Sequence, residues 1–118
     1  MAKKKVMVAE DDIDILEAVQ MILEDAGYEV TTTVDGKTIQ DVQNELPDIF
    51  LLDIWMTGMD GTSICHYLKS QKRTQHIPVI LCSANKDMQR LAKECGADDF
   101  LAKPFEMNDL LDKVDKYV

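Results

Sequence analysis

The sequence contains few of the residues that mark disordered, fibrous or disulfide-stabilised chains. Its 118 residues include only five glycines, three prolines and three cysteines, and 46% of them are hydrophobic. This composition excludes the collagen-like, low-complexity and disordered classes. A chain of this length buries roughly two-thirds of the surface that its unfolded form exposes, which is enough for a core without disulfides or structural metals. We therefore expect one globular domain over residues 1–118.

The cysteines and histidines are too few and too scattered for a common metal or disulfide motif. Cys65, Cys82 and Cys95 share no C-x-x-C or zinc-like spacing, and neither His66 nor His76 lies in a ligand motif. We interpret the cysteines as small buried side chains in a reducing compartment. A redox role is the less favoured alternative, because a low thiol pKa requires a basic neighbourhood that the sequence does not reveal.

Positive charge is also scarce. Thirteen lysines and arginines stand against 22 acidic residues, which gives a net charge of −9 and argues against duplex DNA or an anionic membrane as a direct partner. The one basic cluster, Lys3–Lys5, precedes an apolar run that ends at Ala9. That run is too short for a signal peptide or a membrane span. We expect a soluble, cytoplasmic protein with no direct contact to nucleic acid or membrane.

Short apolar segments alternate with segments of helical periodicity along the whole chain. We expect strands near residues 6–9, 28–33, 49–52, 77–82 and 97–102, and helices near 15–26, 36–45, 60–70, 88–95 and 107–118. Strict alternation predicts right-handed crossovers and a parallel sheet covered on both faces. The first, third and fourth strands are apolar throughout and should be central. The prediction is an α/β fold, a flavodoxin-like (βα)5 doubly wound sheet with strand order 2-1-3-4-5.

Charged and polar side chains follow four of these strands, at the edge of the sheet where ligands bind in such folds. They are Glu10, Asp11 and Asp12, then Asp53, then Ser83, and finally Lys103. Two carboxylates ~4 Å apart repel each other by about 4 kcal/mol at an effective dielectric constant of 20. Lys103 supplies one positive charge, and Mg²⁺, which prefers carboxylate oxygens, would complete the compensation. Asp12 has an equally weighted alternative, because an aspartate after a strand is commonly the N-cap of the next helix.

Several short motifs occur in order along the chain and on the expected strand ends. They are the pair Asp11 and Asp12, Asp53 followed by Met56, the run Gly58 to Gly61, the pair Ser83 and Ala84, and Lys103, Pro104 and Phe105. Together they resemble the receiver domain of two-component response regulators. The resemblance covers the whole chain, and the combination is far more specific than any one of its motifs.

The resemblance implies that Asp53 is the phosphoryl acceptor, with a histidine kinase or a histidine phosphotransfer protein as the donor. An ionised carboxylate needs no general base for this attack, which fits the chemistry. By the same resemblance, Asp12 and Asp53 would bind Mg²⁺ through their side chains, Trp55 through its backbone carbonyl, and Asp11 directly or through water. Lys103 would pair with Asp53 and then with the phosphoryl group.

The resemblance also implies a switch. Ser83 matches the hydroxyl that turns toward the phosphoryl group, and Phe100 matches the aromatic residue that moves with it, although a plain core aromatic is the alternative for Phe100. The helix near 88–95, the strand near 97–102 and the helix near 107–118 would then present the signal to a downstream protein or output domain, with the chain as a monomer or a phosphorylation-dependent dimer. The bond between Lys103 and Pro104 is cis in this family.

Other classes fit the sequence less well. An acidic first loop would repel the phosphate of a flavin, which disfavours a flavodoxin. Dehalogenase-like hydrolases carry a second aspartate two residues after their nucleophile, where this chain has Trp55. An interaction module without phosphorylation is disfavoured because every acceptor-site residue is present, although Thr57 stands where the family usually has proline. We expect a self-phosphorylating signalling domain rather than an enzyme, either standing alone or part of a longer protein.

Overall fold

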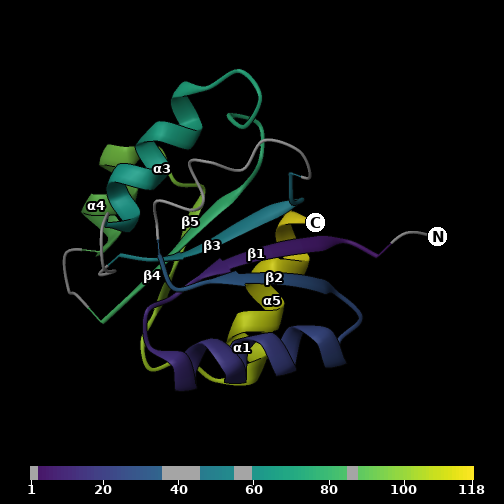
Figure 1. Cartoon of the computed structure of the whole chain (residues 1–118). Helices are drawn as coiled ribbons and strands as arrows, with labels where there is room; N and C mark the ends of the chain where they lie inside the picture. Colours follow the sequence, from purple (N-terminus) through teal and green to yellow (C-terminus); the bar gives the residue numbers. More distant parts are fainter. Residues whose placement is uncertain (1–2, 36–45, 55–59, 85–87) are drawn as a thin grey trace.

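The computed structural model describes residues 3–35, 46–54, 60–84 and 88–118 (Figure 1). The helices and strands are, in chain order, β1 Lys5–Ala9, α1 Ile13–Asp25, β2 Glu29–Thr33, β3 Ile49–Asp53, α3 Gly61–Ser70, β4 Val79–Ser83, α4 Met88–Cys95, β5 Asp99–Ala102 and α5 Met107–Tyr117. The helix predicted near residues 36–45 lies outside the described residues.

The five strands form one parallel sheet in the order β2-β1-β3-β4-β5, as predicted. Helices α1 and α5 cover one face, and α3 and α4 cover the other (Figure 1). The register pairs Ala9 with Leu52, Asp53 with Cys82 and Ser83 with Ala102. The carboxyl ends of β1, β3, β4 and β5 therefore meet at one edge of the sheet.

The central strands have the burial that their sequences predict. Every residue of β3 and β4 is buried, whereas β2 at the sheet edge is only half-buried. Successive side chains on a strand point to opposite faces. On β1 and β3, Met7 and Phe50 accordingly pack toward α3 and α4, and Val8 and Leu51 pack toward α1 and α5. Strands that are buried on both faces have continuous apolar sequences, so the central position of these strands could be predicted.

Helix ends also follow the sequence signals. Asp12 and Asp60 are the N-caps of α1 and α3, and the carboxylate of Asp60 accepts the Ser63 amide at 2.8 Å. Gly27 and Gly96, which follow α1 and α4, have φ values of +100° and +85°, a region that favours glycine. These caps fix where each helix begins and ends relative to the sheet edge.

Two further predictions concern the chain as a whole. All three cysteines are free and buried, which confirms that they pack as small core side chains. Within the described ranges, no helix is long and apolar enough to cross a membrane.

Candidate functional site

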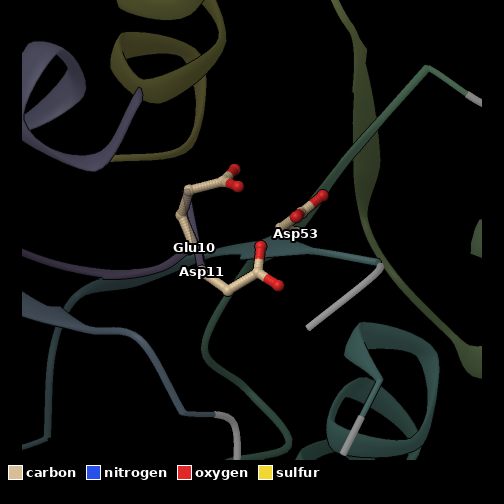
Figure 2. Close-up of side chains that lie close together, drawn as sticks. All are labelled: Glu10, Asp11 and Asp53. Atoms are coloured by element: carbon tan, nitrogen blue, oxygen red, sulfur yellow. The ribbon is translucent and has the colours of Figure 1, made fainter. Parts of the chain in front are cut away.

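Asp53 is the last residue of β3, at the carboxyl end of this central strand. It is buried, with 5% of its surface exposed. Its neighbours come from the end of β1, where Glu10 is buried and Asp11 is exposed. Figure 2 shows the three carboxylates gathered in one place, although β1 and β3 are far apart in the sequence. The parallel register explains the meeting, because Ala9 pairs with Leu52 and the next residue of each strand is acidic.

Lys103 bridges two of these carboxylates. Its Nζ lies 2.6 Å from Oε2 of Glu10 and 3.2 Å from Oδ1 of Asp53. The backbone places it there: the Lys103 amide donates to the carbonyl of Ser83 at 2.9 Å, and the bond to Pro104 is cis, as predicted. Burial alone would lower the pKa of Lys103, but the hydrogen bond to Glu10 and the charge of Asp53 raise it above its ordinary value. Lys103 is therefore a fixed cation in this site.

Glu10 is the most perturbed carboxyl group of the site. Burial raises its pKa to about 6, the hydrogen bond from Lys103 opposes that rise, and Asp53 adds to it. Oε1 of Glu10 also accepts the amide of Asp12 at 3.3 Å, so the carboxylate is held by two donors from different parts of the chain. The raised pKa is thus mainly an effect of burial, with the neighbouring Asp53 as a smaller contribution.

The same three carboxylates form a group that could hold a metal ion. One oxygen from each of Glu10, Asp11 and Asp53 lies within 4.8 Å of the others. Carboxylate oxygens are hard ligands, and Mg²⁺ typically uses one or two of them together with water and a phosphoryl oxygen. The donor set therefore fits Mg²⁺. The predicted fourth ligand, the backbone carbonyl of Trp55, lies outside the described residues.

Asp12 does not lie in this group. Its side chain is exposed, and its Oδ1 accepts the amides of Asp14 at 3.0 Å and Ile15 at 3.3 Å. These amides are among the first N–H groups of α1, which have no partner within the helix. Asp12 is thus the N-cap of α1, the alternative that the sequence left open, and Glu10 rather than Asp12 lies with Asp11 and Asp53.

Comparison with known proteins agrees with this geometry. The family model described as the response regulator receiver domain matches residues 6–115. The chain belongs to this family. This match supports the receiver domain and lends no support to the dehalogenase-like alternative.

Relatives of this receiver domain include regulators and sensors. The chain is 35% identical over 113 residues to the "DNA-binding dual master transcriptional regulator RpaA" of Synechocystis, and the match covers 93% of this chain and 47% of that protein. The chemotaxis response regulator CheY4 of Vibrio cholerae superposes with a TM-score of 0.91 at 28% identity, covering 99% of this chain and 100% of that one. The signal receiver domain of a histidine kinase from Syntrophus aciditrophicus superposes with a TM-score of 0.89 at 31% identity, covering 97% and 89%.

The length of the match differs between these relatives. The chain spans less than half of the length of the curated relatives that it matches. It covers 47% of RpaA, 43% of the transcriptional regulatory protein CseB and 18% of the response regulator PleD. Their shared part is the receiver domain.

The two predicted switch residues lie on neighbouring strands of the receiver domain. Ser83 ends β4, has 1% of its surface exposed, and directly follows Cys82, the register partner of Asp53. Phe100 on β5 is half-buried against the core under α3 and α4, and the Nζ of Lys113 lies 5.7 Å from the centre of its ring. Ser83 thus ends the strand next to the one that ends in Asp53. The switch role of both residues stays a prediction.

Gly61 positions the backbone of Asp53 in a way that the sequence does not reveal. It is the first residue of α3, and its amide donates to the carbonyl of Ile54 at 2.8 Å. A Cβ at this position would lie 2.4 Å from the carbonyl oxygen of Asp53 and 2.9 Å from its carbonyl carbon. Only glycine lets the start of α3 approach the Asp53 backbone this closely. The motif Asp60 and Gly61 is visible in the sequence, but its contact with Asp53 is not.

Replacing this glycine should move the backbone of Asp53. We expect Gly61→Ala to lower the free energy of unfolding by about 1–3 kcal/mol, because the added methyl group must displace backbone rather than a flexible side chain. Urea denaturation measures this loss. His66→Ala, an exposed change further along the same helix, is the matched control and should stay within about 0.5 kcal/mol of the unchanged protein. Equal stability of the two variants would contradict the close approach.

Proposed function

We propose that this receiver domain accepts a phosphoryl group on Asp53 from the phosphohistidine of a histidine kinase or a histidine phosphotransfer protein, in a Mg²⁺-dependent reaction. The observation that carries the proposal is the bridge of Lys103 between Glu10 and Asp53, at a buried strand end beside Asp11. A carboxylate oxygen of Asp53 forms the new bond to phosphorus, the donor's N–P bond breaks, and the histidine ring leaves. The product is an acyl phosphate that water can hydrolyse again.

The described side chains supply what phosphoryl transfer requires, which is positioning and charge compensation rather than proton chemistry. Lys103 holds one oxygen of Asp53 and offers its charge to the phosphoryl oxygens. The buried Ser83 would donate its hydroxyl to the same group. Glu10, Asp11 and Asp53 would hold Mg²⁺, which when bound neutralises charge on the transferred group.

The consequence of phosphorylation would be a changed surface rather than a released product. Receiver domains interact with histidine kinases and with downstream effectors. In this chain we propose that Ser83 and Phe100 couple the acceptor to the face formed by α4, β5 and α5, which would contact a downstream protein or an output domain. We further propose a cytoplasmic domain that phosphorylates itself without turning over a substrate and works as a monomer or a phosphorylation-dependent dimer.

Chemical phosphorylation tests this proposal without knowledge of the kinase. Incubation with Mg²⁺ and acetyl phosphate should add one phosphoryl group, measured by intact mass, and chelation of Mg²⁺ should prevent the addition. Asp53→Asn should abolish it, because an amide oxygen is a far weaker nucleophile than a carboxylate. Asp25→Asn, which removes an equal charge from the exposed end of α1, should leave it unchanged. Addition to Asp53→Asn, or none to the unchanged chain, would rule the proposal out.

A further inference from the structure

Two cysteines that share no sequence motif meet between neighbouring helices. Cys65 of α3 is fully buried, and its Sγ lies 3.5 Å from the backbone carbonyl oxygen of Cys95, at the end of α4. The Sγ of Cys95 lies 3.5 Å from the carbonyl oxygen of Ala92 on its own helix. The two helices lie on the same face of the sheet (Figure 1). The Cys65 thiol therefore contacts the residue that carries the other thiol, and each sulfur can rotate about one side-chain torsion.

Cys95 lies nearer the surface than Cys65, although both are buried. A pocket of about 540 Å³ opens between α3 and α4, and its lining includes His66, Tyr67, Leu91 and Cys95 but not Cys65. Cys95 is 6% exposed, whereas Cys65 is 0% exposed. A small reagent in this pocket would therefore reach Cys95 first.

The thiols also differ in acidity. The neighbouring Cys65 thiol lowers the pKa of Cys95, although burial opposes that change. The proximity of the Cys95 thiol, together with burial, raises the pKa of Cys65. Burial also raises the pKa of Cys82, which lies on β4 away from the pair. Because the thiolate is the reactive form, the accessible member of the pair is also the more nucleophilic one.

We propose that a hydroperoxide oxidises Cys95 and that Cys65 then resolves the product to a disulfide, which tethers α3 to α4. In the first step the Cys95 sulfur attacks the peroxide, the O–O bond breaks, Cys95 becomes a sulfenic acid and hydroxide leaves. In the second step the Cys65 sulfur attacks the Cys95 sulfur, the S–O bond breaks and the Cys65 proton leaves with the oxygen as water. With hydrogen peroxide, two thiols and one peroxide give one disulfide and two waters.

The tether would have a consequence for signalling, and this part rests on the proposed function. Helix α4 belongs to the face that we propose as the output surface. A covalent bond to α3 would restrain it, while the acceptor site at the ends of β1 and β3 would stay intact. The oxidised domain should therefore still accept a phosphoryl group but respond less on its α4 face.

The chemical step can be tested by counting thiols. After treatment of the full chain with hydrogen peroxide, the intact mass measured without reductant should fall by about 2 Da, and dithiothreitol should restore it. Alkylation in denaturant should then find one free thiol, on Cys82, out of the three cysteines of the sequence. A proteolytic digest should contain a linked peptide pair that carries Cys65 and Cys95.

Single substitutions separate the two roles. Cys65→Ser should stop at a sulfenic acid on Cys95 that dimedone traps, Cys95→Ser should lose both reactions, and Cys82→Ala should form the disulfide like the unchanged chain. Disulfide-linked dimers, a disulfide that includes Cys82, or three free thiols after peroxide would overturn the proposal. Phosphoryl addition to Asp53 is a separate readout, so either proposal can fail without the other.

Discussion

Asp11→Asn should weaken Mg²⁺ binding about 10-fold or more, and Asp12→Asn should leave it nearly unchanged. The two substitutions remove the same charge from adjacent residues, so each is a matched control for the other. The difference follows from the geometry: the carboxylate of Asp11 lies with those of Glu10 and Asp53, whereas the carboxylate of Asp12 accepts amide hydrogens of α1. Glu10→Gln should resemble Asp11→Asn, because Glu10 supplies another oxygen of the same group.

Magnesium titration by calorimetry measures this difference, and fluorescence of Trp55, the one tryptophan of the sequence, gives a second signal. Stability supplies an independent check on Asp12. Asparagine caps a helix about as well as aspartate, so Asp12→Asn should unfold like the unchanged chain, whereas Asp12→Ala should lose about 1 kcal/mol. Equal loss of Mg²⁺ affinity in Asp11→Asn and Asp12→Asn would show that Asp12 is a ligand after all.

The fold could be predicted because its signals are local and repeated. The buried runs of β3 and β4 are apolar throughout, and the alternation with helical segments leaves few topologies that obey right-handed crossovers. Capping residues such as Asp60 and closing glycines such as Gly27 mark helix ends without any knowledge of tertiary contacts.

The candidate site could be predicted to within one residue at the end of β1. Asp11, Asp53 and Lys103 lie together as expected, but Glu10 rather than Asp12 completes the group. The missed signal was the strand register: Val6–Ala9 and Ile49–Leu52 are apolar runs of equal length that pair residue for residue. The residues that follow them, Glu10 and Asp53, must therefore be neighbours.

Other features depend on packing that no local pattern encodes. Gly61 touches the backbone of Asp53 because of where α3 begins over the sheet. Cys65 and Cys95 meet because α3 and α4 lie on the same face. Their separation of 30 residues matches no motif, and only the tertiary structure brings them into contact.

Lys103→Met should lower the free energy of unfolding at neutral pH by about 3 kcal/mol. This is the lower end of the loss expected for a broken buried ion pair, because the lysine side chain is still 18% exposed. Methionine keeps the length and apolar stem of lysine but leaves Glu10 and Asp53 facing each other without a cation. Addition of Mg²⁺ should restore part of the loss, since the ion supplies positive charge to the same carboxylates. Urea denaturation with and without Mg²⁺ measures both effects.

Glu10→Gln distinguishes an ion pair from simple packing, because its effect on stability should depend on the residue at 103. With Lys103 present, the substitution removes a buried charge but also the contact of that carboxylate with the ammonium group at 2.6 Å, so the two effects offset each other. With Lys103→Met, the same substitution removes an uncompensated buried charge beside Asp53 and should recover about 2 kcal/mol. Equal effects of Glu10→Gln in the two backgrounds would mean that Glu10 acts mainly through packing, and that the charge compensation we assign to Lys103 does not govern this site.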